Sequence, residues 1–225
     1  MKLHLLGLFL VLFSLFGGAC GGPAASPTGA MGEISLPPPQ TRGGMSLTEA
    51  LALRRSVRSY TEQPLTWEEV SQLLWAAQGV TDRRGFRTAP SAGALYPLEV
   101  YLVLPEGWYH YRPADHRLEV RGRGDLRRDI WGVGLNQEAL LRAPAVFVLT
   151  GVVSRTAAKY GGRAERYVFL EAGHAAQNLL LQATALGLGA VPIGAFDDEG
   201  VRRVLGLPPD ETPLYLIPVG RPGEP

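Results

Sequence analysis

The alternation of hydrophobic and polar positions predicts several helices. Two stretches, Ser46-Leu47-Thr48-Glu49 and Thr66-Trp67-Glu68-Glu69, have the capping-box spacing, in which a hydroxyl and a carboxylate bind each other's free amides at a helix start. The second helix carries one apolar face, and we expect it to end at Gly79 in a left-handed conformation. The longest periodic segment, residues 163–186, is followed by Gly187 and Gly189 and predicts a central helix.

Short runs rich in β-branched and aromatic residues predict strands between these helices. We expect strands at 100–104, 145–150, 190–196 and 214–219, a hairpin from 108–112 and 117–120, and a small helix at 199–205. Helices and strands do not alternate regularly. The pattern therefore favours an α+β fold with helices packed on a mainly antiparallel sheet.

The first 20 residues have the pattern of a secretory signal peptide. Lys2 precedes an apolar run over 5–16, which is too short to span a bilayer comfortably, and small residues precede Cys20. This arrangement resembles the bacterial lipobox, in which the cysteine carries the lipid, and ordinary cleavage without lipid attachment is the alternative. We expect an exported lipoprotein anchored to the membrane through Cys20 on the extracytoplasmic face.

Composition indicates a single folded domain that follows this N-terminal segment. Residues 21–45 are rich in Gly, Pro and Ser without apolar periodicity and predict a flexible tether, which leaves 46–225 as the folded domain. The 22 basic and 21 acidic residues nearly cancel, so the charge does not favour nucleic acid as a partner. Cys20 is the only cysteine, which excludes an intramolecular disulfide.

Three segments of the domain are candidates for ligand binding. Arg54-Arg55-Ser56-Val57-Arg58 places three guanidinium groups and a hydroxyl together, which suits a phosphate, although a solvated basic helix end is an alternative. The small residues of 89–97 and of 187–196 would let backbone amides approach a flat ligand, although both could be ordinary loops. The segment 187–196 lacks the strand-then-helix setting of a dinucleotide fingerprint.

In this order, the three segments resemble the nitroreductase family, and their sequences are most similar to its SagB-type dehydrogenase branch. The resemblance runs from about residue 46 to 221 and includes Lys159-Tyr160-Gly161, Arg166-Tyr167 and the stretch EAGHAAQN at 171–178. It implies a homodimer that binds FMN at the subunit interface. The chain departs from better-known members at Gly194-Ala195, where they often have Glu-Gly, and in its short C-terminus.

The resemblance also implies a role for each segment. The phosphate, ribityl and pyrimidine end of FMN would be held by Arg54, Arg55, Ser56 and Arg58, with Arg221 as a further phosphate ligand. The loop that packs along the isoalloxazine ring from the other subunit would be Pro90, Ser91, Ala92 and Gly93. Backbone amides facing flavin N5 and the C4 carbonyl would come from Ile193, Gly194 and Ala195.

Two further pairs of residues are candidates for catalysis or metal binding. Lys159 and Tyr160 match a pair that is associated with proton removal in members that oxidise azolines, but such a pair also occurs by chance on exposed loops. Glu171 and His174 have a metal-ligand spacing, but a second pair is lacking.

These features favour an FMN-dependent oxidoreductase that transfers hydride between a small organic donor and an acceptor. Two alternatives stay open. One is a flavin-binding or non-enzymatic lipoprotein module of the same fold, and the other is an enzyme that consumes the flavin itself.

Overall fold

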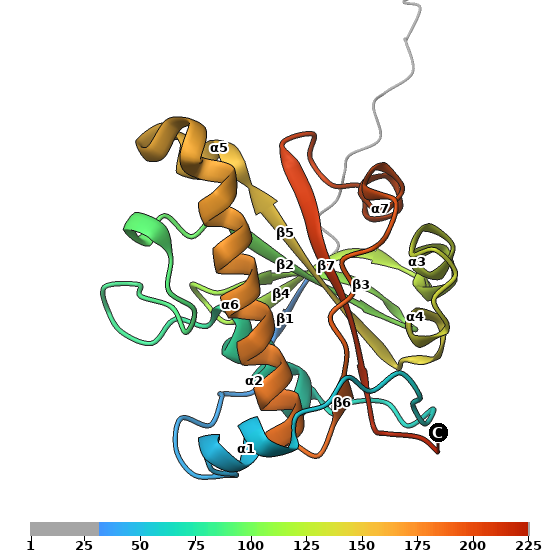
Figure 1. The fold of residues 1–225 in the computed structure, drawn as a ribbon. Helices are drawn as coiled ribbons and strands as arrows, with labels where there is room; N and C mark the ends of the chain where they lie inside the picture. The colour runs from blue at the N-terminus through green and yellow to red at the C-terminus, as the bar shows by residue number, and fades with distance from the viewer. Residues whose placement is uncertain (1–31, 225) are drawn as a thin grey trace, which may run out of the picture.

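A computed structural model describes residues 32–224 of the chain (Figure 1). Within this range, seven strands form one sheet in the order β1-β4-β3-β2-β5-β7-β6, and every pair of neighbouring strands is antiparallel. The strands are β1 (Glu33–Ser35), β2 (Leu98–Leu104), β3 (Gly107–Arg112), β4 (Arg117–Arg123), β5 (Ala145–Val152), β6 (Gly189–Ala190) and β7 (Glu211–Gly220). The predicted α+β class is confirmed.

Helices cover both faces of this sheet (Figure 1). One face carries α1 (Leu47–Leu53), α2 (Trp67–Gln78) and α6 (Ala164–Ala185), and the other carries α3 (Arg127–Val133), α4 (Glu138–Arg142) and α7 (Asp198–Leu205). The short α5 (Val153–Tyr160) leads from β5 toward α6. Two 3₁₀ turns, η1 (Ala92–Ala94) and η2 (Gly161–Arg163), complete the helical elements.

Strand β5 is buried along its whole length because both of its faces are covered. Its side chains alternate, so that Phe147 and Leu149 pack beneath α2 and α6 while Val146 and Val148 pack against α3, α4 and α7. This explains the continuous apolar run in the sequence, which a strand exposed on one face would not have.

Most predicted elements are present, with three corrections. Thr66 and Glu69 form both bonds of the capping box, but Gly79 has φ −65° and is not left-handed. Its lack of a side chain serves close packing, because a Cβ there would lie 2.1 Å from Trp75 Cδ1. The strand expected at 190–196 is reduced to β6 and one bridge at Ile193. Helices α3, α4 and α5 were not predicted.

The prediction of a flexible tether over 21–45 also needs correction, because part of its second half is folded. Glu33–Ser35 pairs with β4 as an edge strand, and Leu36 is buried behind it. The Ser71 hydroxyl donates to the Pro37 carbonyl at 2.6 Å, and His116 Nε2 lies 2.7 Å from the same hydroxyl. Residues 33–40 therefore belong to the folded domain, because tertiary pairing orders a segment whose sequence has no strand signal of its own.

Residues 1–31, which include the expected signal peptide, Cys20 and the first half of the tether, lie outside the described residues. In the part that is described, no helix combines the length and the apolar character needed to cross a membrane.

The packing at Gly79 gives a prediction for stability. A Gly79→Ala variant should lose roughly 1–3 kcal/mol of unfolding free energy, because the added methyl group must displace the Trp75 ring or backbone. Urea unfolding followed by fluorescence measures this loss. Gly132→Ala in α3 is the matched control, since a Cβ there meets nothing within 4 Å and should leave stability unchanged or slightly raised. Equal stability of the two variants would contradict the packing argument.

Candidate functional site

The basic segment that follows α1 lies beside β6. The Val57 amide donates to the Ala190 carbonyl at 3.1 Å, and Ser56 forms a parallel bridge with Ala190. Tyr60 is buried, and its hydroxyl donates to the carbonyls of Val57 and Pro218. The Arg55 guanidinium bonds backbone nearby, because its Nη1 donates to the carbonyls of Ala52 at 3.0 Å and Arg54 at 2.7 Å. Residues Arg55, Ser56 and Arg58 are exposed, and Arg54 is half-buried.

The segment after β6, which begins beside the basic residues at Ala190, presents two exposed backbone amides. Gly194 and Ala195 are exposed, and among the described residues neither amide nitrogen has an acceptor. A Cβ on Gly194 would meet nothing closer than Tyr215 at 3.9 Å, so the space above it is open. Ile193 is different, because it is buried and its amide donates to the Leu216 carbonyl at 2.9 Å. The expectation that Ile193 presents an amide to a ligand is therefore wrong.

Arg221 lies at the same edge of the sheet but already has protein partners. Its backbone carbonyl accepts from the Thr61 amide at 3.0 Å, which places it close to the basic segment. Its Nη2 bonds Glu69 Oε1 at 2.8 Å, and its Nη1 donates to the Pro64 carbonyl at 3.3 Å. In this structure Arg221 ties the end of β7 to the start of α2, a role that the sequence reasoning missed. Arg54, Arg55 and Arg58 are left as the main phosphate candidates.

A second group of predicted residues gathers around η1. Gly93 has φ +64°, and a Cβ there would lie 3.0 Å from both Lys159 Nζ and Tyr160 Oη. The small-residue loop and the Lys159-Tyr160 pair, which are far apart in sequence, are thus in contact. Tyr160 packs edge-on against Tyr167 with the ring centres 4.9 Å apart, and Lys159 is exposed in the single chain.

Glu171 is a member of this second group that the sequence reasoning considered only as a metal ligand. It is buried, and it lines a pocket with Pro90, Ser91, Ala92, Tyr167, Leu170 and His174. Burial raises the pKa of its carboxyl to about 7, although a hydrogen bond from Ser91 and the charges of Arg87 and Arg155 act in the opposite direction. The sequence does indicate that Glu171 is buried, because it falls on the same helical face as the apolar Val168 and Ala175.

The two groups lie toward opposite ends of α6. Helix α1 and strand β6 adjoin its C-terminal end, whereas α5 and η1 lie toward its N-terminal half (Figure 1). A helix of 22 residues is about 33 Å long. A single chain therefore holds two half-sites. We call residues 54–58 with 194–195 the basic half-site, and residues 90–93 with 159–160 and Glu171 the loop half-site.

Comparison with known proteins identifies the family of the chain. Residues 51–221 match the model of the nitroreductase family, and this range contains both half-sites. The chain belongs to the nitroreductase family. Its members are oxidoreductases, so the resemblance noted in the sequence is confirmed at the level of the family.

Individual relatives support the same assignment. The chain is 44% identical to a candidate nitroreductase of Methanocaldococcus jannaschii over 84% of this chain and 96% of that protein. A crystal structure of a candidate nitroreductase from Ralstonia eutropha superposes with a TM-score of 0.76 at 34% identity, covering 86% of this chain and 90% of the other. The microcin B17-processing protein McbC of Escherichia coli is 30% identical over 54% of this chain and 48% of its own length.

Proposed function

We propose that this protein is an FMN-dependent oxidoreductase of the SagB-type dehydrogenase branch, with the flavin bound between two copies of the chain. The separation of the two half-sites carries the proposal. Each chain offers cations and free amides toward one end of α6 and a small-residue loop with Lys159 and Tyr160 toward the other. A two-fold axis would bring the basic half-site of one copy to the loop half-site of the next.

The residues of the basic half-site fit FMN. Guanidinium groups give bidentate, charge-assisted bonds to phosphate, and three of them lie within five residues. The amides of Gly194 and Ala195 can donate to the acceptor edge of the ring. Bound FMN would supply a hydride acceptor and donor. A guanidinium group close to the pyrimidine would stabilise the negative charge of reduced flavin.

The loop half-site would meet the other face of the cofactor. Gly93 has no side chain to hold the ring away, and the contact with Lys159 and Tyr160 keeps that pair beside the loop. We infer that Lys159 and Tyr160 bind the substrate and exchange a proton with it during hydride transfer. The partial match to McbC, whose name describes processing of microcin B17, supports this assignment.

Flavin retention tests the basic half-site. Arg54→Ala and Arg58→Ala should each weaken FMN binding about ten- to a hundredfold, because each removes a charge-assisted contact worth roughly 1.5–3 kcal/mol. The measurement is a titration of the flavin-free protein with FMN, followed by absorbance and fluorescence. Arg142→Ala in α4 is the control, since that exposed arginine lies on the other face of the sheet, where it pairs with Glu138. If all three variants bind FMN as wild type does, the phosphate assignment fails.

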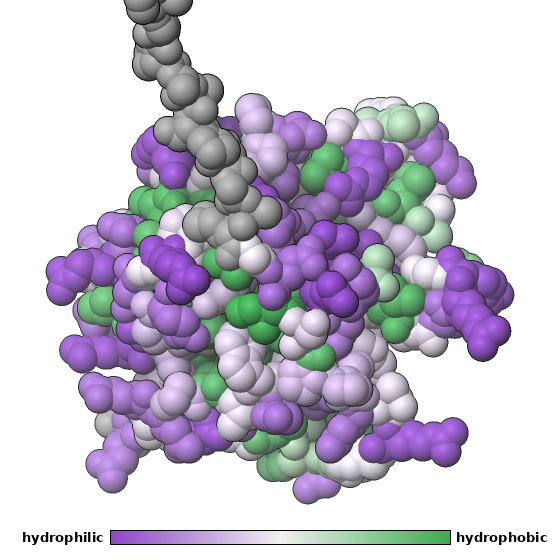
Figure 2. Space-filling view, turned by 180° about the vertical axis from the view of Figure 1, so that it is seen from behind, coloured by the Kyte–Doolittle hydropathy of each residue, from purple (hydrophilic) through white to green (hydrophobic). Residues whose placement is uncertain are grey.

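Exposed apolar side chains favour the same dimer. Leu47, Leu51 and Leu53 on α1 are each at least 55% exposed, and Phe169 and Leu170 on α6 are about half exposed. These residues cover the side of the sheet that both half-sites share. Seen from behind, by contrast, hydrophobic residues form small separate groups among hydrophilic ones (Figure 2). Exposed apolar side chains on α1 and α6 support an interface on this side.

Sedimentation of a form that lacks residues 1–20 tests the shared site. We expect a dimer at micromolar concentration. Leu51→Glu should give monomers that lose flavin, because it places a charge in the interface. Leu135→Glu is the matched control, since Leu135 is equally exposed but lies beside α3. A monomer that retains a full complement of FMN would contradict the shared-site model.

We further propose that the enzyme works outside the cytoplasm, anchored through Cys20. The tether before Glu33 would separate the lipid from the fold, so Cys20→Ala should release the domain from the membrane without changing its flavin spectrum. Cell fractionation and spectra of the two forms provide the measurement. A wild-type protein found wholly in the cytosol would refute the anchor and make nicotinamide the expected donor.

A further inference from the structure

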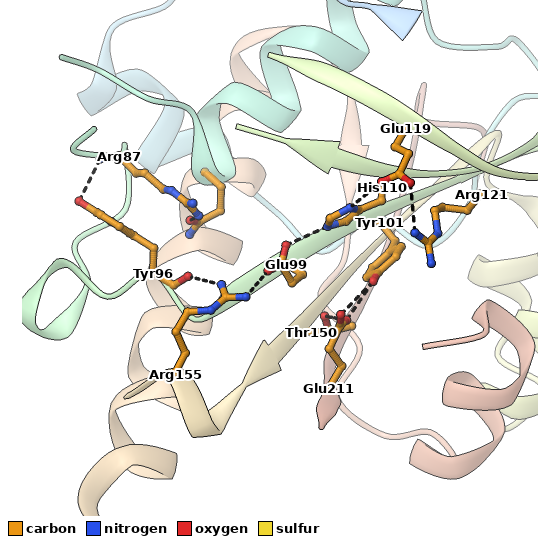
Figure 3. A network of polar contacts seen from close by, with 11 residues as sticks. Arg87, Tyr96, Glu99, Tyr101, His110, Glu119, Arg121, Thr150, Arg155 and Glu211 are labelled. Atoms are coloured by element: carbon orange, nitrogen blue, oxygen red, sulfur yellow. Dashed lines mark hydrogen bonds and ion pairs between the residues drawn. The ribbon is translucent and has the colours of Figure 1, made fainter. Parts of the chain in front are cut away.

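Tyr96 lies at the end of the small-residue loop and is bonded through its amide, its hydroxyl and its carbonyl. The amide donates to the Ser91 hydroxyl at 2.9 Å, and the hydroxyl accepts from the Arg87 amide at 3.1 Å. The Arg87 guanidinium also lies 4.7 Å from the centre of the Tyr96 ring. The Tyr96 carbonyl accepts from Arg155 Nη1 at 2.8 Å (Figure 3). Of these contacts, only the last comes from α5.

The loop that ends at Tyr96 has a backbone that needs support from its surroundings. Gly93, Ala94 and Tyr96 have φ +64°, +53° and +47°. This left-handed conformation is unfavourable for a residue with a side chain, so Ala94 and Tyr96 adopt it only where other contacts hold them. The bond from Arg155 to the Tyr96 carbonyl is one such contact. Its loss should therefore loosen the loop.

The other arm of Arg155 reaches the sheet. Its Nη2 donates to Glu99 Oε1 at 2.7 Å, and Glu99 Oε2 lies 2.8 Å from His110 Nε2 (Figure 3). Burial alone would raise the pKa of Glu99, but the hydrogen bonds with His110 and Arg155 lower it, so this carboxyl is ionised at neutral pH. A planar guanidinium holds two acceptors in fixed directions, which a lysine ammonium does not. Arg155 thereby joins α5 to the loop and to β2.

Helix α5 has little buried surface of its own to hold it in place. Only one of its 8 residues is buried, and a short helix depends on contacts with the rest of the fold. Arg155 and Lys159 are four residues apart and lie on the same side of this helix. At its end, Lys159 Nζ and Tyr160 Oη would each lie 3.0 Å from a Cβ on Gly93. The helix thus meets the same loop at two places, Tyr96 and Gly93.

We propose that Arg155 is a positioning residue, which holds α5 and the loop in one alignment so that Lys159 and Tyr160 lie beside Gly93. Two contacts between the same two segments fix their alignment, whereas a single contact leaves the helix free to turn about it. Without Arg155, the contact at Gly93 would be left alone. The consequence for catalysis rests on the proposed function, in which Lys159 and Tyr160 face the substrate.

Hydrogen exchange tests the effect on the loop. The amides of Ala94, Leu95 and Tyr96 bond to acceptors within the loop, so their protection factors report its order. Arg155→Gln should lower these factors about tenfold, the low end of the range for a bond from a charged group, because the Arg155 side chain is 39% exposed. The amides of β5 should keep their protection, which separates loosening of the loop from a loss of global stability.

A single lysine reports the position of the pair. In a form that lacks residues 1–20, Lys159 is the only lysine of the chain, so labelling lysine with carbon-13 gives the signals of one side chain. A Cβ on Gly93 would take the place of one α hydrogen and would lie 3.3 Å from Lys159 Cδ. We therefore expect a nuclear Overhauser effect between these two residues in wild type and its loss in Arg155→Gln.

Arg121→Gln is the matched control. Like Arg155, Arg121 bonds a carboxylate and has a partly exposed side chain, 36% against 39%, but it lies on β4 away from the loop (Figure 3). This variant should keep both the loop protection and the Overhauser effect of wild type. Either wild-type loop protection or an undiminished Overhauser effect in Arg155→Gln overturns the proposal.

A second variant tests the same link if Arg155→Gln does not fold. Glu99→Gln removes the charged partner of one arm of Arg155 and leaves the bond to the Tyr96 carbonyl. It should lower the loop protection in the same direction by a smaller factor. In that case, unchanged loop protection in Glu99→Gln overturns the proposal.

The measurements are made on the flavin-free protein and again with FMN. If the loop and Lys159 follow Arg155 while no flavin binds, the positioning role stands and the proposed function fails. If flavin binds while the loop and Lys159 do not respond to Arg155→Gln, only the positioning role fails.

Discussion

The close contact between α6 and the sheet is the constraint on which the rest of the structure depends. The buried face of this helix is rich in alanine, and a Cβ on Gly151 of β5 would lie 2.6 Å from Val168 Cγ1. Small residues on both sides let the helix lie directly on the strands. Because α6 is then a rigid support of 22 residues, whatever packs against its two ends is held at a fixed separation.

This separation is the basis of the proposed site shared between two chains. The basic segment is fixed to β6 by the bond from Val57 to Ala190, and the small-residue loop is fixed against α5 by the contact of Gly93 with Lys159. Neither half can move along α6 without breaking the core. A ligand that needs both halves must take them from two chains, so assembly and cofactor binding are expected to depend on each other.

A chain of partly exposed charged groups joins the Tyr96 loop to the sheet. Arg155 and Glu99 join the Tyr96 loop to β2, and from there His110 leads on to β3 (Figure 3). A buried ion pair adds little stability compared with apolar packing, but it fixes geometry, because each member is costly to leave unpaired. The network therefore suits a strained loop that has to be held in one position.

Local sequence patterns were enough to predict several elements of this fold. The continuous apolar run of β5 and the 3.6-residue period of α6 record burial directly, and the Thr66 capping box is a local hydrogen-bond pattern, so each was predicted correctly. The order of Arg54–Arg58, the small-residue loop and the segment after β6 was enough to indicate the family.

Only the tertiary structure decided which of these residues have polar groups free to bind a ligand. Glu33–Ser35 becomes a strand because β4 offers an unpaired edge, and Ile193 loses its free amide because Leu216 lies opposite. The Arg221 guanidinium is bonded to Glu69, and the buried Glu171 lines a pocket together with Ser91. Each of these facts depends on a partner distant in sequence. Local periodicity records whether a position is buried, but it does not record which group lies across from it.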